Sequence, residues 1–289
     1  MVTGASSGVG FEVALGLARA GADIVIADVN DRQGRWAVEK IRPLAPASLV
    51  RFERIDLASL AMIETFAKRI EQIERPVDLL VNNAGILAPS RRQVTVDGFE
   101  MQLGTNFLGH FALTARLLPL LRRGLDPRVV QVGSLSHRFA SINLDDLHHE
   151  RRYAPMKAYG QSKLALLLFA FELQRRSDLG RWRLMSVAAH PGYARTALLA
   201  NSRGAGSLAD RLHRSVGRLL NHSAEAGALP ILYAAAAPGA RPGAYYGPKG
   251  FLELVGKTGL ARIGEAARDT ELAQRLWAVS EKLTGVTWP

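Results

Sequence analysis

The 289-residue sequence contains no cysteine, which excludes disulfide bonds, thiolate metal sites and cysteine nucleophiles. It has no basic and apolar leader ahead of its first glycine-rich segment, so we expect a cytoplasmic location. Long apolar runs are also missing, because the longest, such as Leu164 to Phe171 and Leu229 to Ala237, fall well short of the ~20 residues that span a bilayer. No transmembrane segment is therefore expected.

Acidic residues are comparatively few: 26 Asp and Glu stand against 37 Lys and Arg, for a formal net charge of +11. This charge raises nucleic-acid binding through phosphate contacts as an alternative. The arginines, however, occur as scattered pairs without interleaved aromatic residues or a recognisable binding module. Solvated helix faces explain them more simply, and no nucleic-acid partner is expected. The length and the 48% hydrophobic content suit one α/β domain over residues 1–289.

A glycine-rich turn begins at Thr3 and runs into a helical pattern. Its residues of interest are Gly4, Ser6, Ser7, Gly8, Val9 and Gly10. Turns of this kind direct free backbone N–H groups at a pyrophosphate. The turn therefore indicates a dinucleotide site.

Asp28 ends a predicted buried strand, eighteen residues after Gly10. The dinucleotide fold places an acid near this position on the adenosine ribose, where a carboxylate would repel the extra phosphate of NADP. Two alternatives stay open: Asp28 caps the helix that begins near Asp31, or Arg32 or Arg35 neutralises it and admits the phosphate. The pattern favours NAD over NADP as the cofactor.

Tyr159 and Lys163 lie four residues apart in a helical pattern, so they share one face of the helix. A nearby cation favours the phenolate and lowers the pKa of a tyrosine. The pair is thus a candidate acid/base, with a surface Tyr and Lys on an amphipathic helix as the alternative.

Together with further motifs, these residues resemble the short-chain dehydrogenase/reductase family from Thr3 to about Tyr246. The further motifs are Asn82-Asn83-Ala84-Gly85, Asn106, Ser134 and Pro191-Gly192. The wide spacing of 25 residues from Ser134 to Tyr159, with Ser134-Leu135-Ser136-His137, resembles the branch of retinol dehydrogenases, the WW-domain oxidoreductase and protochlorophyllide reductase. Only Met1–Thr3 precede the glycine turn, where the family has a longer strand; a shortened central strand and a start further upstream both fit.

The resemblance implies a role for each site residue. In the reaction, Ser134 would hold the substrate oxygen, with Ser136 as the alternative residue for this role. Tyr159 would transfer the proton, and Lys163 would lower the pKa of Tyr159 and hold the nicotinamide ribose. Asn106 would support a water relay from a local irregularity of its helix. For the cofactor, Asp56, followed by Leu57, would bind the adenine amine or merely cap a helix. The adenosine side would be supported by Asn83, Ala84 and Gly85. The nicotinamide carboxamide would be held by Pro191, Gly192 and Thr196. His137, His148 and His149 are interpreted as loop histidines, and no metal site is expected.

The fold implied is a doubly wound parallel sheet of the Rossmann type, with a substrate lid over residues 200–223 and a C-terminal extension over 247–289. The lid has an apolar stripe with arginines between, which favours packing over an apolar cleft and leaves a membrane surface as the alternative. By the same resemblance, the helices over 99–123 and 154–176 would form a homodimer or homotetramer interface.

We therefore expect hydride transfer between NAD and a hydrophobic primary or secondary alcohol, or the corresponding aldehyde or ketone in reverse. A reductase of a conjugated carbon–carbon double bond and a non-catalytic, nicotinamide-sensing regulator are the alternatives.

Overall fold

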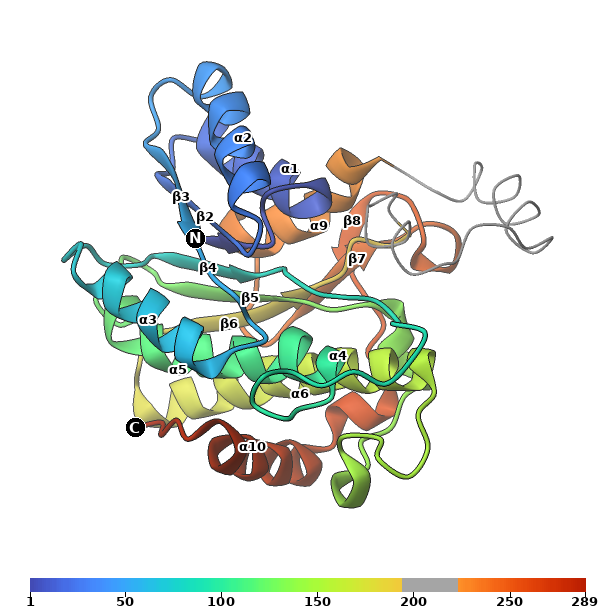
Figure 1. The fold of residues 1–289 in the computed structure, drawn as a ribbon. Coiled ribbons are helices and arrows are strands. Elements are labelled where there is room, and N and C mark those ends of the chain that lie inside the picture. The colour runs from blue at the N-terminus through green and yellow to red at the C-terminus, as the bar shows by residue number, and fades with distance from the viewer. Residues whose placement is uncertain (194–222) are drawn as a thin grey trace.

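An eight-stranded sheet organises the computed structural model, which describes residues 1–193 and 223–289 (Figure 1). Its strand order is β3-β2-β1-β4-β5-β6-β7-β8; β1 to β7 pair in parallel and β8 is antiparallel to β7. The strands are β1 (Val2–Thr3), β2 (Ile24–Asp28), β3 (Val50–Arg54), β4 (Leu79–Asn82), β5 (Arg128–Val132), β6 (Met185–Ala189), β7 (Tyr245–Pro248) and β8 (Thr258–Leu260). The order reverses between β1 and β4, which makes their carboxyl ends the place where ligands bind in such sheets.

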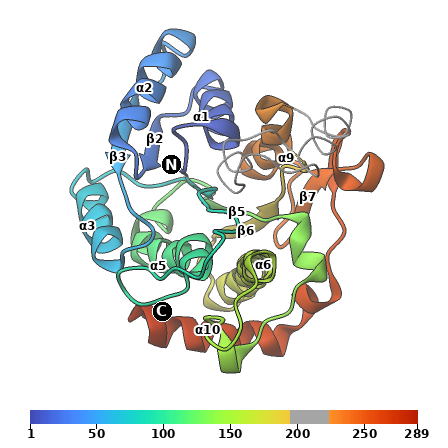
Figure 2. The same ribbon diagram turned by 45° about the vertical axis from the view of Figure 1, so that its right-hand side comes forward.

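Helices cover both faces of the sheet, as Figure 2 shows. One face carries α1 (Gly8–Arg19), α2 (Asp31–Ile41) and α9 (Ala224–Ala236), and the other carries α3 (Leu60–Glu71), α5 (Gly109–Leu121) and α6 (Pro155–Gly180). Buried aliphatic side chains from the strands form a separate core with each set of helices. The predicted Rossmann-type α/β fold is confirmed.

The first strand is short, and it lies in the middle of the sheet. Val2 pairs with Ile26 of β2 and with Val81 of β4, and Thr3 pairs with Ala27. Both strand residues are fully buried. Two residues thus suffice to connect the outer β2–β3 pair to the rest of the sheet and to place the glycine turn at its carboxyl edge.

The helix predicted over 99–123 is interrupted. It consists of α4 (Met101–Leu103), a π-helical turn η2 (Gly104–Leu108) and then α5. Within η2, the Gly109 N–H bonds to the Gly104 carbonyl, five residues back. Such π turns are frequent at functional sites, and this one contains Asn106.

The C-terminal helix α10 (Thr270–Thr284) lies against the outer side of α6 and α5 (Figure 2). The Trp277 ring packs edge-on against Phe111 of α5, with ring centroids 5.0 Å apart, and tilted against Phe169 of α6, with centroids 5.6 Å apart. The Arg176 guanidinium lies 4.2 Å from the centre of the Trp277 ring. The face predicted to join subunits is therefore covered by the chain's own C-terminal helix. The oligomeric state itself stays a prediction.

Shorter elements connect the remainder. These are the 3-10 turns η1 (Arg42–Leu44), η3 (Leu135–Phe139), η4 (Leu144–Asp146), η5 (Phe251–Glu253) and η6 (Glu265–Arg268). Within residues 1–193 and 223–289, no helix is long and apolar enough to span a bilayer. The predicted lid lies outside the described residues, apart from Ser223, whose side chain caps α9.

Candidate active site

The glycine turn follows β1 and is too tight for side chains. Gly4 and Gly8 adopt left-handed φ angles of 63° and 58°. A Cβ on Gly4 would lie 2.7 Å from the Ala84 Cα, and one on Gly10 would lie 2.4 Å from the Gly4 carbonyl oxygen. Helix α1 begins at Gly8, and its exposed N-cap, Ser7, makes no side-chain capping bond. The turn therefore presents backbone N–H groups at a helix N-terminus.

The loop after β4 holds this turn in place. The Asn83 side-chain amide donates to the carbonyls of Thr3 (2.8 Å) and Gly4 (3.2 Å). The backbone N–H groups of Asn83 and Ala84 donate to the Thr3 hydroxyl at 2.9 and 3.0 Å. Asn83 and Ala84 thus meet the glycine turn, and the side chain of Asn83 bonds to the protein's own backbone.

Asp28 lies half-buried at the carboxyl end of β2. Its carboxylate accepts from the backbone N–H groups of Ser6 (3.2 Å) and Asn30 (3.1 Å). The cap of α2 is Asn30, which accepts from Gln33 N–H, so the capping alternative for Asp28 is wrong. Arg35 pairs with Asp31 at 2.8 Å, in a surface ion pair.

Asp56 and Leu57 follow β3. The Asp56 carboxylate accepts from the Ala58 N–H at 2.9 Å, whereas α3 is capped by Ser59. The idea that Asp56 caps this helix is therefore wrong, although it orders the turn before it. Leu57 is buried, and its carbonyl would lie 2.4 Å from a Cβ on Gly109, so the loop packs directly on α5.

Ser134, Tyr159 and Lys163 meet at the carboxyl end of β5. Ser134 follows β5 by two residues and caps η3. Its hydroxyl accepts a hydrogen bond from the Ser136 N–H at 3.3 Å. The Ser134 side chain lies close enough to the Tyr159 phenol to affect its pKa. The Lys163 ammonium donates to the Val132 carbonyl at 2.9 Å and lies 5.9 Å from the Tyr159 ring centre. Tyr159 and Lys163 are both buried, so the surface-pair alternative is wrong.

The pKa of Tyr159 is raised in this structure, whereas the spacing from Lys163 predicted that it would be lowered. Burial raises the pKa of Tyr159, and the nearby Ser134 side chain opposes that rise. Burial also lowers the pKa of Lys163 from 10.5 to about 8. Desolvation penalises the charged forms of both side chains, so burial has the largest effect on the pKa of the phenol in this structure.

Asn106 lies beside Lys163, fully buried in the π turn. Its amide donates to the Ser162 hydroxyl (2.9 Å) and the Ile86 carbonyl (3.1 Å), and its side-chain oxygen accepts from Ile86 N–H (2.8 Å). A Cβ on Gly85 would lie 3.1 Å from that oxygen and 3.6 Å from the Lys163 ammonium. Gly85 therefore leaves open the space between the two side chains.

His110 was missed by sequence reasoning, although it lies one turn after Asn106. Its Nδ1 donates to the Asn106 carbonyl at 2.8 Å, and its Nε2 lies 2.9 Å from the Thr3 hydroxyl. Burial lowers its pKa to about 3, so the ring is neutral and bridges the strand before the glycine turn to the π turn. The four-residue spacing from Asn106 was the available signal.

The loop after β6 begins with His190, Pro191 and Gly192. Gly192 has a left-handed φ of 68°, and its N–H donates to the His190 Nδ1 at 3.1 Å. Thr196 lies outside the described residues. His137, interpreted above as a loop histidine, is instead 1% exposed.

The described residues fit a nicotinamide dinucleotide. A turn without room for Cβ atoms begins α1, a carboxylate ends β2, and the Ser134–Tyr159 pair lies at the same sheet edge. The two ends of the site are held together by the Thr3–His110–Asn106 bridge. The arrangement suits proton transfer to and from an oxygen beside such a cofactor.

Comparisons with known proteins agree with this geometry. The family model for short chain dehydrogenases matches residues 1–205. Mouse polyprenol dehydrogenase is 42% identical over 99% of this chain and 83% of its own length, and human retinol dehydrogenase 13 is 38% identical over 100% and 85%. A crystal structure of an uncharacterised Mycobacterium paratuberculosis protein has a TM-score of 0.81 and 39% identity over 99% of this chain and 93% of that one. As predicted, the chain belongs to the short-chain dehydrogenase/reductase family, in its retinol dehydrogenase-like branch.

Proposed function

We propose that this protein, a member of an oxidoreductase family that uses nicotinamide cofactors, interconverts a hydrophobic alcohol and its aldehyde or ketone with NAD. The observation that carries the proposal is the convergence of Ser134, the buried Tyr159 and Lys163 at the sheet edge where the glycine turn also lies. A non-catalytic sensor would have no need for a buried phenol beside a serine.

Each side chain has one task in this proposal. Ser134 donates to the substrate oxygen and positions it, and Tyr159 takes the hydroxyl proton during oxidation or returns it during reduction. Lys163, charged below a pKa of about 8, stabilises the phenolate as it forms and contacts the nicotinamide ribose. Asn106 keeps the π turn against Ile86 and Ser162, which supports the proton route at the buried end. A bound nicotinamide would supply the hydride acceptor or donor.

The preference for NAD rests on Asp28. Its carboxylate is already oriented by two backbone N–H groups, from Ser6 and Asn30. Arg35 is engaged by Asp31, on the exposed side of α2. A fixed carboxylate accepts hydrogen bonds from a ribose diol and repels a 2'-phosphate.

The hydrophobic substrate class is supported by apolar side chains that are exposed on the elements carrying or following the reacting groups, η3 and α6, and on η5, which contacts η3. Phe139 is 93% exposed at the end of η3, and Met156 is exposed three residues before Tyr159. Phe251 and Leu252 of η5 are exposed as well. The names of two relatives, polyprenol dehydrogenase and retinol dehydrogenase 13, also refer to apolar alcohols.

A two-step experiment tests the proposal. Fluorescence titration with NADH and NADPH should give tighter binding of NADH, and a panel of apolar alcohols, ketones and conjugated alkenes should give turnover of the alcohols and ketones. Tyr159→Phe should keep NADH affinity and lose turnover. Tighter NADPH binding would overturn the role of Asp28, turnover of the alkenes alone would favour double-bond reduction, and undiminished turnover by Tyr159→Phe would remove that residue from the reaction.

A further inference from the structure

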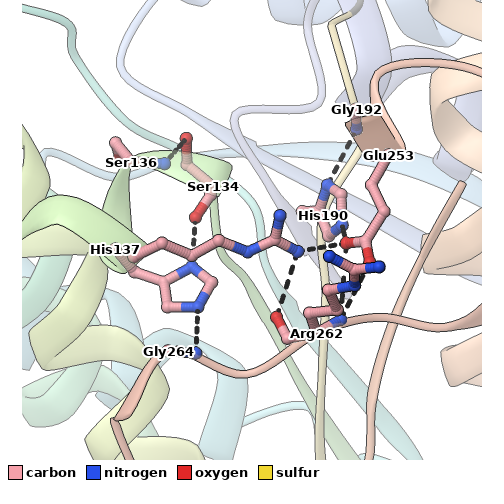
Figure 3. Close-up of polar contacts among 9 residues, drawn as sticks. Ser134, Ser136, His137, His190, Gly192, Glu253, Arg262 and Gly264 are labelled. Atoms are coloured by element: carbon pink, nitrogen blue, oxygen red, sulfur yellow. Dashed lines mark hydrogen bonds and ion pairs between the residues drawn. The ribbon is translucent and has the colours of Figure 1, made fainter. Parts of the chain in front are cut away.

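The C-terminal extension reaches the loop that carries Ser134. Figure 3 shows the carboxylate of Glu253 directed at the side chains around that loop. Glu253 ends η5, and its carboxylate forms a close ion pair with the Arg138 guanidinium in η3. The two residues are 115 positions apart in sequence, and their side chains are 12% and 21% exposed.

The same carboxylate also contacts the segment that follows β8, the strand paired with β7. The Arg262 N–H donates to it at 3.1 Å, and Arg138 donates to the Arg262 carbonyl at 3.1 Å. Leu252 and Glu253 both adopt left-handed φ angles, 49° and 59°. Such angles are unfavourable for residues with a Cβ, so the surrounding contacts hold the backbone in the conformation that turns Glu253 inward.

A third contact of Glu253 involves the loop after β6. The His190 Nε2 lies 3.5 Å from the carboxylate, and its Nδ1 accepts from Gly192 N–H. Because Nδ1 accepts, the ring proton is on Nε2, facing Glu253. The ring fits only because residue 247 is glycine: a Cβ there would lie 2.0 Å from His190 Nε2. Glu253 thus orients the histidine that holds the Pro191-Gly192 backbone.

A parallel bridge acts directly on Ser134. The Gly264 N–H donates to the His137 Nε2 at 3.1 Å, and the His137 Nδ1 donates to the Ser134 carbonyl at 2.6 Å (Figure 3). A Cβ on Gly264 would lie 3.1 Å from the Arg138 Cα, so the extension backbone packs closely on η3. Arg138 and His137 are therefore held from the same segment, within one turn of Ser134.

We propose that Glu253 is a positioning residue for the reaction: through Arg138 it aligns the Ser134 loop, and through His190 it aligns the Pro191-Gly192 loop against it. The proposal rests on the proposed function. The two loops end neighbouring strands, β5 and β6, and would face the substrate oxygen and the cofactor ring respectively. One carboxylate that contacts both sets their separation, which matters because a misplacement of about 1 Å can cost on the order of 100-fold in rate.

The test compares Glu253→Gln, Arg138→Met and the double variant with the wild type. Glu253→Gln keeps the size of the side chain and one acceptor oxygen but removes the charge. We expect kcat to fall at least about tenfold with an unchanged thermal midpoint, and the deuterium isotope effect on kcat to rise as hydride transfer becomes rate-limiting. The double variant should lose no more than the worse single variant, because the pair acts as one unit.

Glu271→Gln is the matched control, an exposed glutamate of the same extension that should keep wild-type kcat. Wild-type kcat and isotope effect in Glu253→Gln would overturn the proposal, as would independent, multiplicative losses in the double variant. If Glu253→Gln does not fold, Arg138→Met carries the same test from the other side of the pair. A wild type without any turnover would instead refute the proposed function, so the two failures are distinguishable.

Discussion

Replacing Lys163 with methionine should make the protein more stable while abolishing turnover. Lys163 is 4% exposed, and burial lowers its pKa from 10.5 to about 8. That fall corresponds to a cost of about 3 kcal/mol for holding the buried charge at neutral pH. Methionine removes this cost but also the hydrogen bond to the Val132 carbonyl, worth about 1 kcal/mol. The variant should therefore gain about 2 kcal/mol in unfolding free energy at pH 7.

The pH dependence gives this prediction a second, independent measurement. The folded-state pKa lies below the unfolded one, so the wild type bears the full cost below about pH 8 and regains stability as the pH rises towards 10.5. The advantage of Lys163→Met in urea unfolding should be largest at pH 7 and shrink across that interval. Lys257→Met, at an exposed lysine, should change neither quantity. A variant that is less stable than the wild type at pH 7, or whose difference does not vary with pH, would refute the reasoning.

Three other outcomes are expected. Because the pKa of Tyr159 is raised and Lys163 keeps its charge below its pKa of about 8, initial rates of carbonyl reduction should be flat between about pH 6 and about pH 7.5, while alcohol oxidation rises over the same interval; a falling oxidation rate there would contradict this. His110 has a folded pKa of about 3 and an unfolded one of 6.5, so the unfolding free energy should fall by about 1.4 kcal/mol per pH unit below pH 6.5, and His110→Gln should reduce that slope in acid denaturation. Trp277→Ala should cost about 3–5 kcal/mol in urea unfolding, and a loss under 1 kcal/mol would mean that α10 packs loosely.

Local pattern was sufficient wherever one face of an element had to be buried. The helix expected near Asp31 begins at that residue, because Asn30 caps it and periodic apolar residues follow. The irregularity in the helix over 99–123 was expected only from the family resemblance, since the apolar residues of that helix carry no mark of the extra residue that makes the π turn. The short strand β8, Thr-Gly-Leu, has no periodic signal and forms only because β7 lies beside it.

In the candidate site, too, local motifs were predictable from the sequence and contacts between distant segments were not. Motifs near one another in sequence predicted the residues that would act on a ligand, and the structure brings Ser134, Tyr159, Lys163 and Asn106 together. The contacts that hold them were not predictable, because Arg138 and Glu253 join segments 115 residues apart. The raised pKa of Tyr159 was not predictable for a related reason: spacing along a helix gives proximity, whereas burial depends on the whole fold.

The aromatic cluster between α10, α5 and α6 separates the tryptophans of the protein into two groups that fluorescence can distinguish. Three of its four tryptophans lie in that cluster, where the ring centroid of Trp288 is 6.2 Å from that of Trp182 and 4.6 Å from that of Trp277. The fourth, Trp36, is 47% exposed on α2 and packs against Phe11 of α1. Acrylamide should therefore quench Trp36 more strongly than the buried Trp182 and Trp277 in the native protein, whereas a red shift from those two would report detachment of the C-terminal helix. One fluorescence experiment can thus report separately on the α1–α2 region and on the packing of α10.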